Sequence, residues 1–370
     1  MNSKITKIEI YKINIPLKKS FSISLGTVDT ANNIAIRIHT DSGLIGTGEC
    51  SPFVYILGET QDSAFEIAKD LSMVLLSSNP IEIEDRLASL DKAVPGNNTI
   101  KSAFDMALYD LLGKQAGMPL YQILGGSCKR EIISDMTVYL DSPENMAKDA
   151  FTYFKEGFPV IKVKLGTNKI DDLVRIKAIR KAIGNNLPLR IDANQGWDKV
   201  TAISILKSLE SYNIEYCEEP IPKWNLRDLK KVKEASPIPI MADESVSDHR
   251  DAFKLASADA CDYFNIKLSK AGGIHNALKI IAIGESAGIK CQVGGMDESR
   301  FALTAITHLV AARNNISYFD LDSSMSHDID PVIGGLEYKG KGKWVLPDLP
   351  GIGAEFDPEF LKNSEKIEII

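Results

Sequence analysis

The sequence predicts an α/β protein in which a small α+β domain precedes a parallel (β/α) barrel. About the first 125 residues read as strands followed by helices, whereas from about residue 131 short apolar strands alternate with helical segments. Eight such strands fit into roughly 190 residues. This strand count favours a closed barrel over the doubly wound sheet that the same alternation also permits.

The N-terminal region has the pattern of a mixed domain. Three segments have the apolar spacing of strands: residues 5–15, 33–39 and 44–49. The turn Ser42-Gly43 separates the last two of them. Residues 99–115 carry apolar side chains such as Ala103 and Leu111 at helical spacing. We therefore expect an α+β domain over residues 1–125.

The barrel is predicted from the strand and helix pattern of residues 126–340. The eight predicted strands are residues 133–139, 160–165, 187–192, 214–218, 238–242, 263–268, 290–293 and 317–320. Helices are predicted between them, for example at residues 145–156, 169–182, 200–212 and 274–286. After residue 333 the chain becomes irregular and rich in Gly and Pro. We expect residues 341–370 to form a tail that returns to the first domain.

Composition excludes several classes of function. The chain has 43 Lys and Arg against 50 Asp and Glu, a net charge of −7 that repels nucleic acid and anionic lipid. Residues 1–10 alternate polar and apolar side chains without an apolar signal core, and no apolar stretch of about 18 residues follows, so we expect neither export nor membrane insertion. The five scattered cysteines, Cys128 among them, show no CxxC spacing and fit a reducing compartment. We expect a cytoplasmic homo-oligomer with a small-molecule substrate and no nucleic-acid or membrane partner.

Charged residues gather at the predicted C-terminal strand ends, where barrel enzymes place their chemistry. Lys162 and Lys164 are two residues apart on one strand and therefore share a face. The apolar residues between and beside them must face the helices, so the two lysines are expected to point into the barrel. Buried ammonium groups need partners. The alternative is a polar strand end that reaches solvent.

The next three strands end in carboxylates. Asp192 is followed 26 residues later by Glu218, with Glu219 beside it, and Asp243 lies 25 residues after Glu218. Three acids on neighbouring strand ends form an all-oxygen site that suits Mg²⁺. A single acid at a strand end also commonly caps a helix or pairs with a cation, but three in register favour a metal. Zinc is disfavoured because no histidine falls at a predicted strand end.

A reaction follows from the position of Lys267 at the end of the sixth predicted strand. Strands two and six of an eight-stranded barrel lie opposite each other, so Lys164 and Lys267 would face each other across a metal-bound carboxylate substrate. Proton removal by one lysine and delivery by the other inverts the α-carbon, whereas use of one alone gives elimination or isomerisation. A lysine base needs a pKa lowered from about 10.4 toward 7 to 8. We expect the like charge of Lys162 and the bound metal to lower the pKa of Lys164, and we expect Lys162 to contact the substrate carboxylate.

The motifs that carry these residues resemble the muconate-lactonizing subgroup of the enolase superfamily over nearly the whole chain. They are Lys162-Val163-Lys164, the run Asp-Ala-Asn-Gln-Gly-Trp at 192–197, Glu218-Glu219-Pro220, Ala242-Asp243-Glu244-Ser245 and Asn265-Ile266-Lys267. The resemblance implies a (β/α)7β modified TIM barrel with an α+β capping domain formed by the N-terminal region and the C-terminal tail. It also implies that Lys164 and Lys267 are the acid/base pair.

The same resemblance implies the metal site. Asp192, Glu218 and Asp243 correspond to the ligands of one Mg²⁺ per subunit, with Glu218 chosen over Glu219 by its place before Pro220. Asn194 corresponds to a residue that supports these ligands.

Asp320-Leu321-Asp322, after the eighth predicted strand, resembles the DxD signature of dipeptide epimerases related to L-Ala-D/L-Glu epimerase. Strand eight lies opposite strand four, so these acids could receive the α-ammonium group of a dipeptide whose C-terminal carboxylate is at the metal. The implied reaction inverts the C-terminal residue by two-base proton transfer through a Mg²⁺-stabilised enediolate. The alternative that the two acids form a turn or cap a helix stays open.

Other functions fit less well. N-acylamino acid racemase, o-succinylbenzoate synthase and muconate cycloisomerase act on substrates that offer no ammonium group to two acids. A noncatalytic barrel that binds a metal or ligand does not need the complete acid/base set. A Rossmann dehydrogenase is disfavoured because no GxGxxG opens a helix after a strand.

The side chain that the substrate carries is the open question. The L-Ala-D/L-Glu epimerases carry an Arg in the first capping loop, whereas residues 21–29 here contain no cation and Gly26 takes that position. A cation could instead come from Lys18, Lys19 or Arg300. We expect Tyr55 to form another wall of the pocket. Asp297, after the seventh strand, would favour a cationic side chain.

Overall fold

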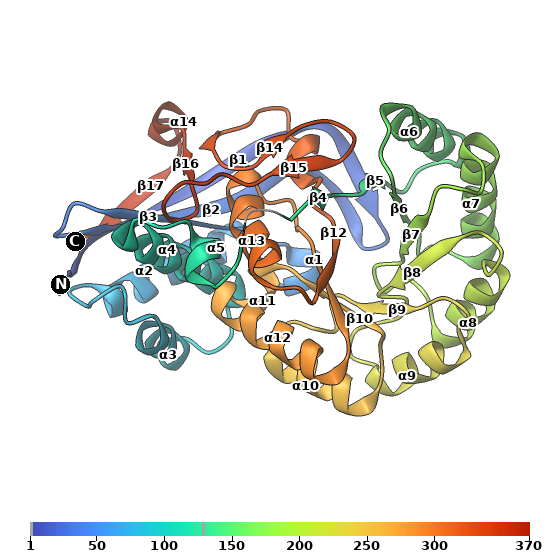
Figure 1. Ribbon diagram of the computed structural model, residues 1–370, viewed down its shortest axis with the longest axis horizontal. Coiled ribbons are helices and arrows are strands. Elements are labelled where there is room, and N and C mark those ends of the chain that lie inside the picture. Colours follow the sequence, from blue (N-terminus) through green and yellow to red (C-terminus); the bar gives the residue numbers. More distant parts are fainter. Residues whose placement is uncertain (1–2, 128–129) are drawn as a thin grey trace.

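The computed structural model describes residues 3–127 and 130–370, so Cys128 lies outside the described residues. It consists of an antiparallel sheet with helices on it, the cap, and a curled parallel sheet with helices around it, the barrel (Figure 1). The predicted fold class is confirmed.

The cap is built on a sheet with strand order β17-β1-β2-β3. The bounds are β1 (Ile5–Ile23), β2 (Gly26–Thr40), β3 (Ile45–Cys50) and β17 (Lys366–Ile369). Its helices are α1 (Val54–Leu57), α2 (Gln61–Leu75), α3 (Ile83–Ala93), α4 (Asn98–Ala116) and α5 (Leu120–Ile123). Gly46 and Gly48 let β3 lie directly on α4, because a Cβ at either position would meet the carbonyl oxygens of Ala107 or Ala103.

The first two strands are longer than predicted. Residues 21–29, expected to be a loop, form the tip of a β-hairpin in which Phe21 pairs with Val28 and Ile23 with Gly26. A register shift between Pro16 and Phe21 interrupts the regular pairing. The sequence pattern breaks at this shift, which is why the second half of the hairpin did not read as strand.

The barrel sheet is parallel, and its strands follow one another in chain order. The described strands are β5 (Met136–Val138), β6 (Ile161–Lys164), β7 (Leu189–Asp192), β8 (Ile214–Glu218), β9 (Ile240–Ala242), β10 (Tyr263–Ile266), β11 (Lys290–Val293) and β12 (Ile316–Phe319). The N–H of Asp135 donates to the carbonyl of Phe319 (3.3 Å), which links the first strand to the last.

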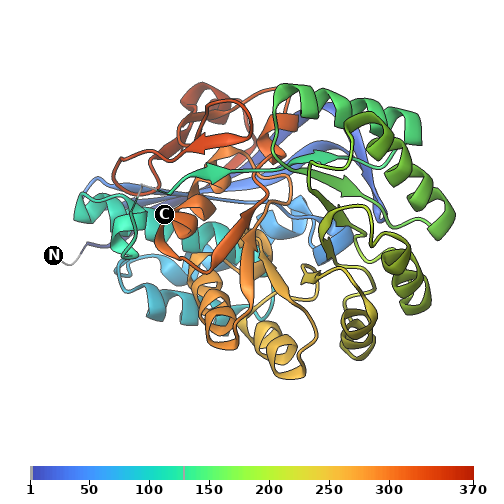
Figure 2. The same cartoon turned by 45° about the vertical axis from the view of Figure 1, so that its right-hand side comes forward.

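Helices cover the outside of the barrel, as Figures 1 and 2 show. They are α6 (Pro143–Glu156), α7 (Lys169–Ile183), α8 (Lys199–Ser208), α9 (Leu226–Ala235), α10 (His249–Ala258), α12 (Ile274–Ala287) and α13 (Arg300–Ala312). The short, buried helix α11 (Leu268–Ala271) follows β10 and contacts α4 of the cap. In the described part of the chain, the short turn η1 (Ser323–Ser326) follows β12 in place of an eighth barrel helix, which gives the (β/α)7β form.

The chain after η1 is more regular than predicted. It forms β13 (Val332–Gly334), β14 (Glu337–Tyr338), β15 (Lys343–Val345), β16 (Ala354–Phe356) and α14 (Pro358–Lys362) before β17. β15 pairs with β4 (Ile132–Ile133), a strand that shares only Ile133 with the predicted first barrel strand. β17 pairs with β1, so the tail returns to the cap as predicted. No helix among the described residues has the length and apolar character needed to cross a membrane.

Candidate active site

Three carboxylates meet at the C-terminal ends of the central barrel strands. Asp192 ends β7, Glu218 ends β8 and Asp243 directly follows β9. One carboxylate oxygen of each lies within 4.8 Å of those of the other two, and all three residues are fully buried. Their meeting follows from the parallel register, in which Asp192 is the partner of Glu218.

Glu219 turns to the other side of the chain. Its backbone has a φ of 33°, and its carboxylate accepts the N–H groups of Asp243 (2.7 Å) and Ser245 (3.1 Å). Glu219 therefore holds the loop after β9, whereas Glu218 joins the three carboxylates. Spacing alone did not distinguish these two neighbours.

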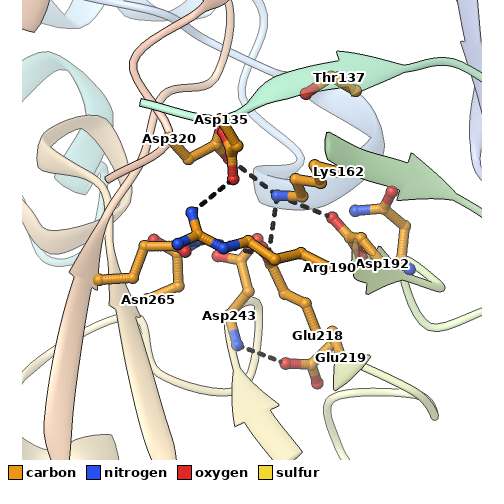
Figure 3. Close-up of polar contacts among 12 residues, drawn as sticks. Asp135, Thr137, Lys162, Arg190, Asp192, Glu218, Glu219, Asp243, Asn265 and Asp320 are labelled. Carbon is orange, nitrogen blue, oxygen red and sulfur yellow. Dashed lines mark hydrogen bonds and ion pairs between the residues drawn. The ribbon is translucent and has the colours of Figure 1, made fainter. Parts of the chain in front are cut away.

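Lysines surround the carboxylates. Lys164 Nζ lies 2.7 Å from Asp192, and Lys267 Nζ lies 2.7 Å from Asp243. Lys162 Nζ lies 2.8 Å from Glu218 and 3.3 Å from Asp192. Figure 3 shows Lys162 at the centre of these contacts. The predicted acid/base and metal-ligating side chains thus lie in one buried cluster.

Two further residues of the cluster were missed from the sequence. Lys270 Nζ, on α11, lies 2.6 Å from Asp243 Oδ1 and is 1% exposed. Asn265 Nδ2 donates to Glu218 Oε1 (2.8 Å). Asn265 is two residues before Lys267 and shares its face, so the reasoning that oriented Lys162 and Lys164 would have found it. Lys270 lies on a short helix after the strand, so the alternation of faces along a strand does not identify it.

Electrostatics in the cluster differ from the expectation. Burial lowers the pKa of Lys267, but the charges of Asp243 and Glu218 outweigh burial and leave this pKa above its ordinary value. Burial, assisted by Asp192, raises the pKa of Glu218 to about 7. The pKa of Lys267 is therefore not lowered toward neutrality by these residues alone. Lys162 faces Asp192, Glu218 and Asp320, whose charges offset its own.

The donor set fits a hard divalent cation. It consists of carboxylate oxygens alone, which Mg²⁺ prefers. Among the described residues, two further buried oxygens beside this donor set, Asn194 Oδ1 and Glu244 Oε2, accept no hydrogen bond. The N–H of Asn194 donates to Asp192 Oδ1 (2.9 Å), and its Nδ2 donates to Glu244 Oε1 (3.2 Å). Asn194 thus contacts a candidate ligand directly, in the supporting position expected of it.

A cavity lies over the cluster, between barrel and cap. The barrel contributes polar side chains to it: Lys162, Lys164, Asn194, Lys267, Asp297, Asp320 and Asp322. The cap contributes apolar ones: Phe21, Ile23, Phe53 and Ile56. A molecule in this cavity would therefore have its charged groups toward the barrel and its apolar groups toward the cap.

Asp320 and Asp322 lie at the opposite wall, after β12. Asp320 Oδ2 lies 2.8 Å from Lys162 Nζ, and Asp322 Oδ2 accepts the N–H of Thr137 (2.7 Å). Burial, assisted by Asp320, raises the pKa of Asp322 to about 7. Asp322 therefore receives a backbone N–H from the neighbouring strand, and both carboxylates line the cavity.

Asp135 and Arg190 were missed from the sequence. One carboxylate oxygen of Asp135 lies within 4.8 Å of those of Asp320 and Asp322. Arg190 Nη1 lies 2.8 Å from Asp135 Oδ2 (Figure 3). Arg190 is two residues before Asp192 on β7 and shares its inward face, a signal that the sequence did contain.

Two predicted substrate-contacting residues lie away from the cavity lining. A Cβ at Gly26 would meet the ring of Tyr55 at 2.7 Å, and Tyr55 is 49% exposed. Tyr55 thus packs on Gly26 and lines a neighbouring cavity, which Phe53 and Asp297 also border.

Asp297, in contrast, lines the cavity. Its backbone has a φ of 69°, and its Oδ1 lies 3.3 Å from His327 Nε2. In the described structure its buried Oδ2 has no hydrogen-bond donor.

The cations considered as substitutes for the missing arginine are engaged elsewhere. Lys18 Nζ donates to the carbonyl of Met325 (2.9 Å), and Lys19 Nζ lies 3.7 Å from Asp141. Arg300 Nε lies 2.7 Å from Asp330.

Comparison with known proteins gives two family matches. Residues 5–125 match the N-terminal domain of the mandelate racemase / muconate lactonizing enzyme family, and residues 145–360 match the enolase C-terminal domain-like family. The chain is 46% identical to the D-Ala-D/L-Ala epimerase of Cytophaga hutchinsonii, over 98% of this chain and 99% of that protein. It is 41% identical to the L-Ala-D/L-Glu epimerase of Bacillus subtilis, over 95% and 96% of the two chains.

A solved structure is also similar. The crystal structure of the dipeptide epimerase of Cytophaga hutchinsonii complexed with Mg and D-Ala-L-Val superimposes with a TM-score of 0.98 at 46% identity. The match covers 99% of this chain and 100% of that one.

Proposed function

Because the chain belongs to the mandelate racemase / muconate lactonizing enzyme family, with its enolase-like C-terminal domain, we propose that it is a Mg²⁺-dependent dipeptide epimerase. One observation carries this proposal. Lys164 and Lys267 are each paired with one of three clustered, buried carboxylates, and both lysines line a cavity that Asp320 and Asp322 line as well. This arrangement suits a substrate with a carboxylate at one end and an ammonium group at the other.

Asp192, Glu218 and Asp243 would hold one Mg²⁺ per subunit. When bound, Mg²⁺ stabilises the negative charge that develops on the substrate carboxylate as the α-proton leaves. The three side chains fix the end of the substrate that carries the reacting carbon.

Proton transfer is the task of Lys164 and Lys267. They come from β6 and from the end of β10, four strands apart, and both side chains line the cavity. One lysine removes the α-proton of the C-terminal residue, and the other returns a proton to the opposite face. The configuration of that carbon is thereby inverted.

Asp320 and Asp322 would bind the α-ammonium group of the N-terminal residue. Both are buried, and Asp320 already contacts the ammonium of Lys162, so this wall is built to hold a cation. An N-acylated amino acid offers no cation here, and this distinguishes the epimerase from the N-acylamino acid racemase alternative.

We further propose that the enzyme is a cytoplasmic homo-oligomer. Among the described cysteines, Cys50, Cys217, Cys261 and Cys291 are buried and free, as in a reducing compartment. Large apolar side chains such as Trp224 (80%) and Phe253 (63%) are exposed and available for subunit contacts. Light scattering measures the oligomeric state directly.

The test of function is α-hydrogen exchange in D₂O. We expect dipeptides to gain one mass unit at the C-terminal residue and to epimerise, while N-acetyl amino acids do not react. Asp322→Asn should lower kcat/KM for dipeptides by roughly 10²-fold, since it weakens a charge-assisted contact with the ammonium group. Exchange of N-acetyl amino acids but not of dipeptides would establish the racemase alternative instead.

A further inference from the structure

The upper wall of the cavity is apolar. We infer that the epimerised residue of the dipeptide carries an uncharged, apolar side chain, received by Ile23, Phe53 and Ile56 of the cap. This inference rests on the proposed function and adds the substrate class to it.

Two hydrogen bonds place this part of the cap over the metal-ligating end of the cavity. Ser24 Oγ, next to Ile23, donates to the carbonyl of Asn194 (2.7 Å), in the loop that follows Asp192. Lys223 Nζ, in the loop after β8, donates to the carbonyl of Ile56 (2.8 Å). The C-terminal residue of the substrate has its carboxylate at this end, so its side chain lies under Ile23 and Ile56.

This subsite offers no cation to an acidic side chain. Among the described residues that line the cavity, the cations are Lys162, Lys164 and Lys267, and each lies within 2.8 Å of a carboxylate. A glutamate side chain would lose its water without gaining a counterion, which is unfavourable. Asp297, in the same cavity, adds a negative charge that opposes it further.

The position at which an arginine could enter from the cap is closed. The ring of Tyr55 occupies the space that a Cβ at Gly26 would need. The hairpin tip therefore presents Ile23 to the cavity without a charged neighbour beside it.

A cationic side chain is also disfavoured. Asp297 Oδ1 is paired with His327 (3.3 Å), which leaves the buried Oδ2, without a donor in the described structure, as the one oxygen of Asp297 that could accept from a lysine ammonium. One such contact replaces the hydration of an ammonium group only in part, whereas an apolar side chain loses no hydration of this kind.

The decisive experiment compares four dipeptides on the wild-type enzyme with Mg²⁺: L-Ala-L-Leu, L-Ala-L-Gln, L-Ala-L-Glu and L-Ala-L-Lys. Deuterium incorporation at the α-carbon gives kcat/KM for each. We expect kcat/KM for L-Ala-L-Leu to exceed the values for L-Ala-L-Glu and L-Ala-L-Lys at least about tenfold. Gln and Glu are nearly isosteric, and we expect kcat/KM for L-Ala-L-Gln to be higher than that for L-Ala-L-Glu. Faster exchange with Glu or Lys than with Leu overturns the inference alone. Absence of exchange with all four overturns the proposed function.

A variant tests the subsite itself. Ile56→Lys places an ammonium group where an apolar side chain is expected, so it should raise the Glu-to-Leu ratio of kcat/KM about tenfold or more. Ile170→Lys, at a position 75% exposed on α7, is the matched control and should leave the ratio unchanged. Equal ratios in both variants contradict the assignment of Ile56, and a thermal melt confirms that both are folded.

Discussion

Lys162 Nζ lies 2.8 Å from Asp320 Oδ2 and 2.8 Å from Glu218 Oε2. One buried ammonium group therefore contacts both clusters of acidic residues, the one that contains Glu218 and the one that contains Asp320. The proposed ammonium-binding wall and the proposed metal site are thereby electrostatically linked. Any change to Lys162 acts on both.

We predict that Lys162→Met destabilises the protein by about 3 to 5 kcal/mol, the usual cost of leaving buried charges unpaired. Urea unfolding measures this loss, and added Mg²⁺ should recover part of it by neutralising Glu218. The exposed Lys148→Met is the control and should have little effect. Equal stability of the two variants would show that the ammonium of Lys162 is not needed for charge balance.

The two lysines should have separable roles. We predict that Lys164→Ala and Lys267→Ala each lower epimerisation by roughly 10²- to 10⁴-fold, the usual contribution of an acid or base. Each variant should still exchange the α-proton of one isomer, L or D, which faces the remaining lysine. Proton NMR in D₂O with each isomer separately checks this. Exchange of both isomers by the same variant would refute the two-base assignment.

Mg²⁺ should bind at the three carboxylates and stabilise the fold. We predict that EDTA abolishes exchange and that Mg²⁺ at about a hundred times its Kd adds about 2.7 kcal/mol of stability. Asp243→Asn should reduce this gain, since it removes a ligand charge. Asp149→Asn, on α6, is the control and should retain the gain in stability on Mg²⁺ binding. Calorimetric titration and thermal melts measure both, and an unchanged gain in Asp243→Asn would place the metal elsewhere.

Stability should depend on pH through Glu49, which joins cap and barrel. Its carboxylate accepts the N–H groups of Ser299 (2.8 Å) and Ala302 (3.0 Å) at the start of α13. Burial nevertheless raises its pKa from 4.5 to about 7. The folded protein therefore keeps this proton up to about pH 7, whereas the unfolded chain releases it near pH 4.5.

The sign follows from these proton affinities. The contribution of Glu49 to stability is greatest below pH 4.5 and declines as the pH rises to about 7. Urea unfolding of wild type and Glu49→Gln across this range should show the wild type losing stability relative to the variant. A constant difference would contradict the raised pKa.

The sequence predicted most of the barrel because its signal is local. Strand ends such as Asp192 and Glu218 follow directly from short apolar segments, and each boundary needs only nearby residues. The hairpin tip at residues 21–28 was not predicted, because its pairing depends on contacts across the register shift and on Tyr55 covering Gly26. The contact of Tyr55 with Gly26 is absent from any local window, and the register shift interrupts the alternation that marks a strand.

Residues two apart on a strand share a face, and this rule identifies inward-facing residues before the strand ends as well as at them. It places Arg190, two residues before Asp192, and Asn265, two residues before Lys267, on the inward face of their strands. It also places Asp135, within the predicted strand 133–139, on the same face as Thr137, which lines the cavity. The pairing of Asp135 with Arg190, from a different strand, does not follow from this reasoning. Lys270 needed the short helix α11 to reach Asp243.

The pairing of β17 with β1 has a consequence for how the protein is made. Residues 366–369 lie beside residues 8–11, so the cap sheet joins two strands that are more than 350 residues apart in the chain. The barrel strands emerge from the ribosome in spatial order and can pair during translation, whereas this edge of the cap sheet must wait until residues 366–369 have been made. Until then the outer edge of β1 is unpaired and open to chaperones or to another nascent chain.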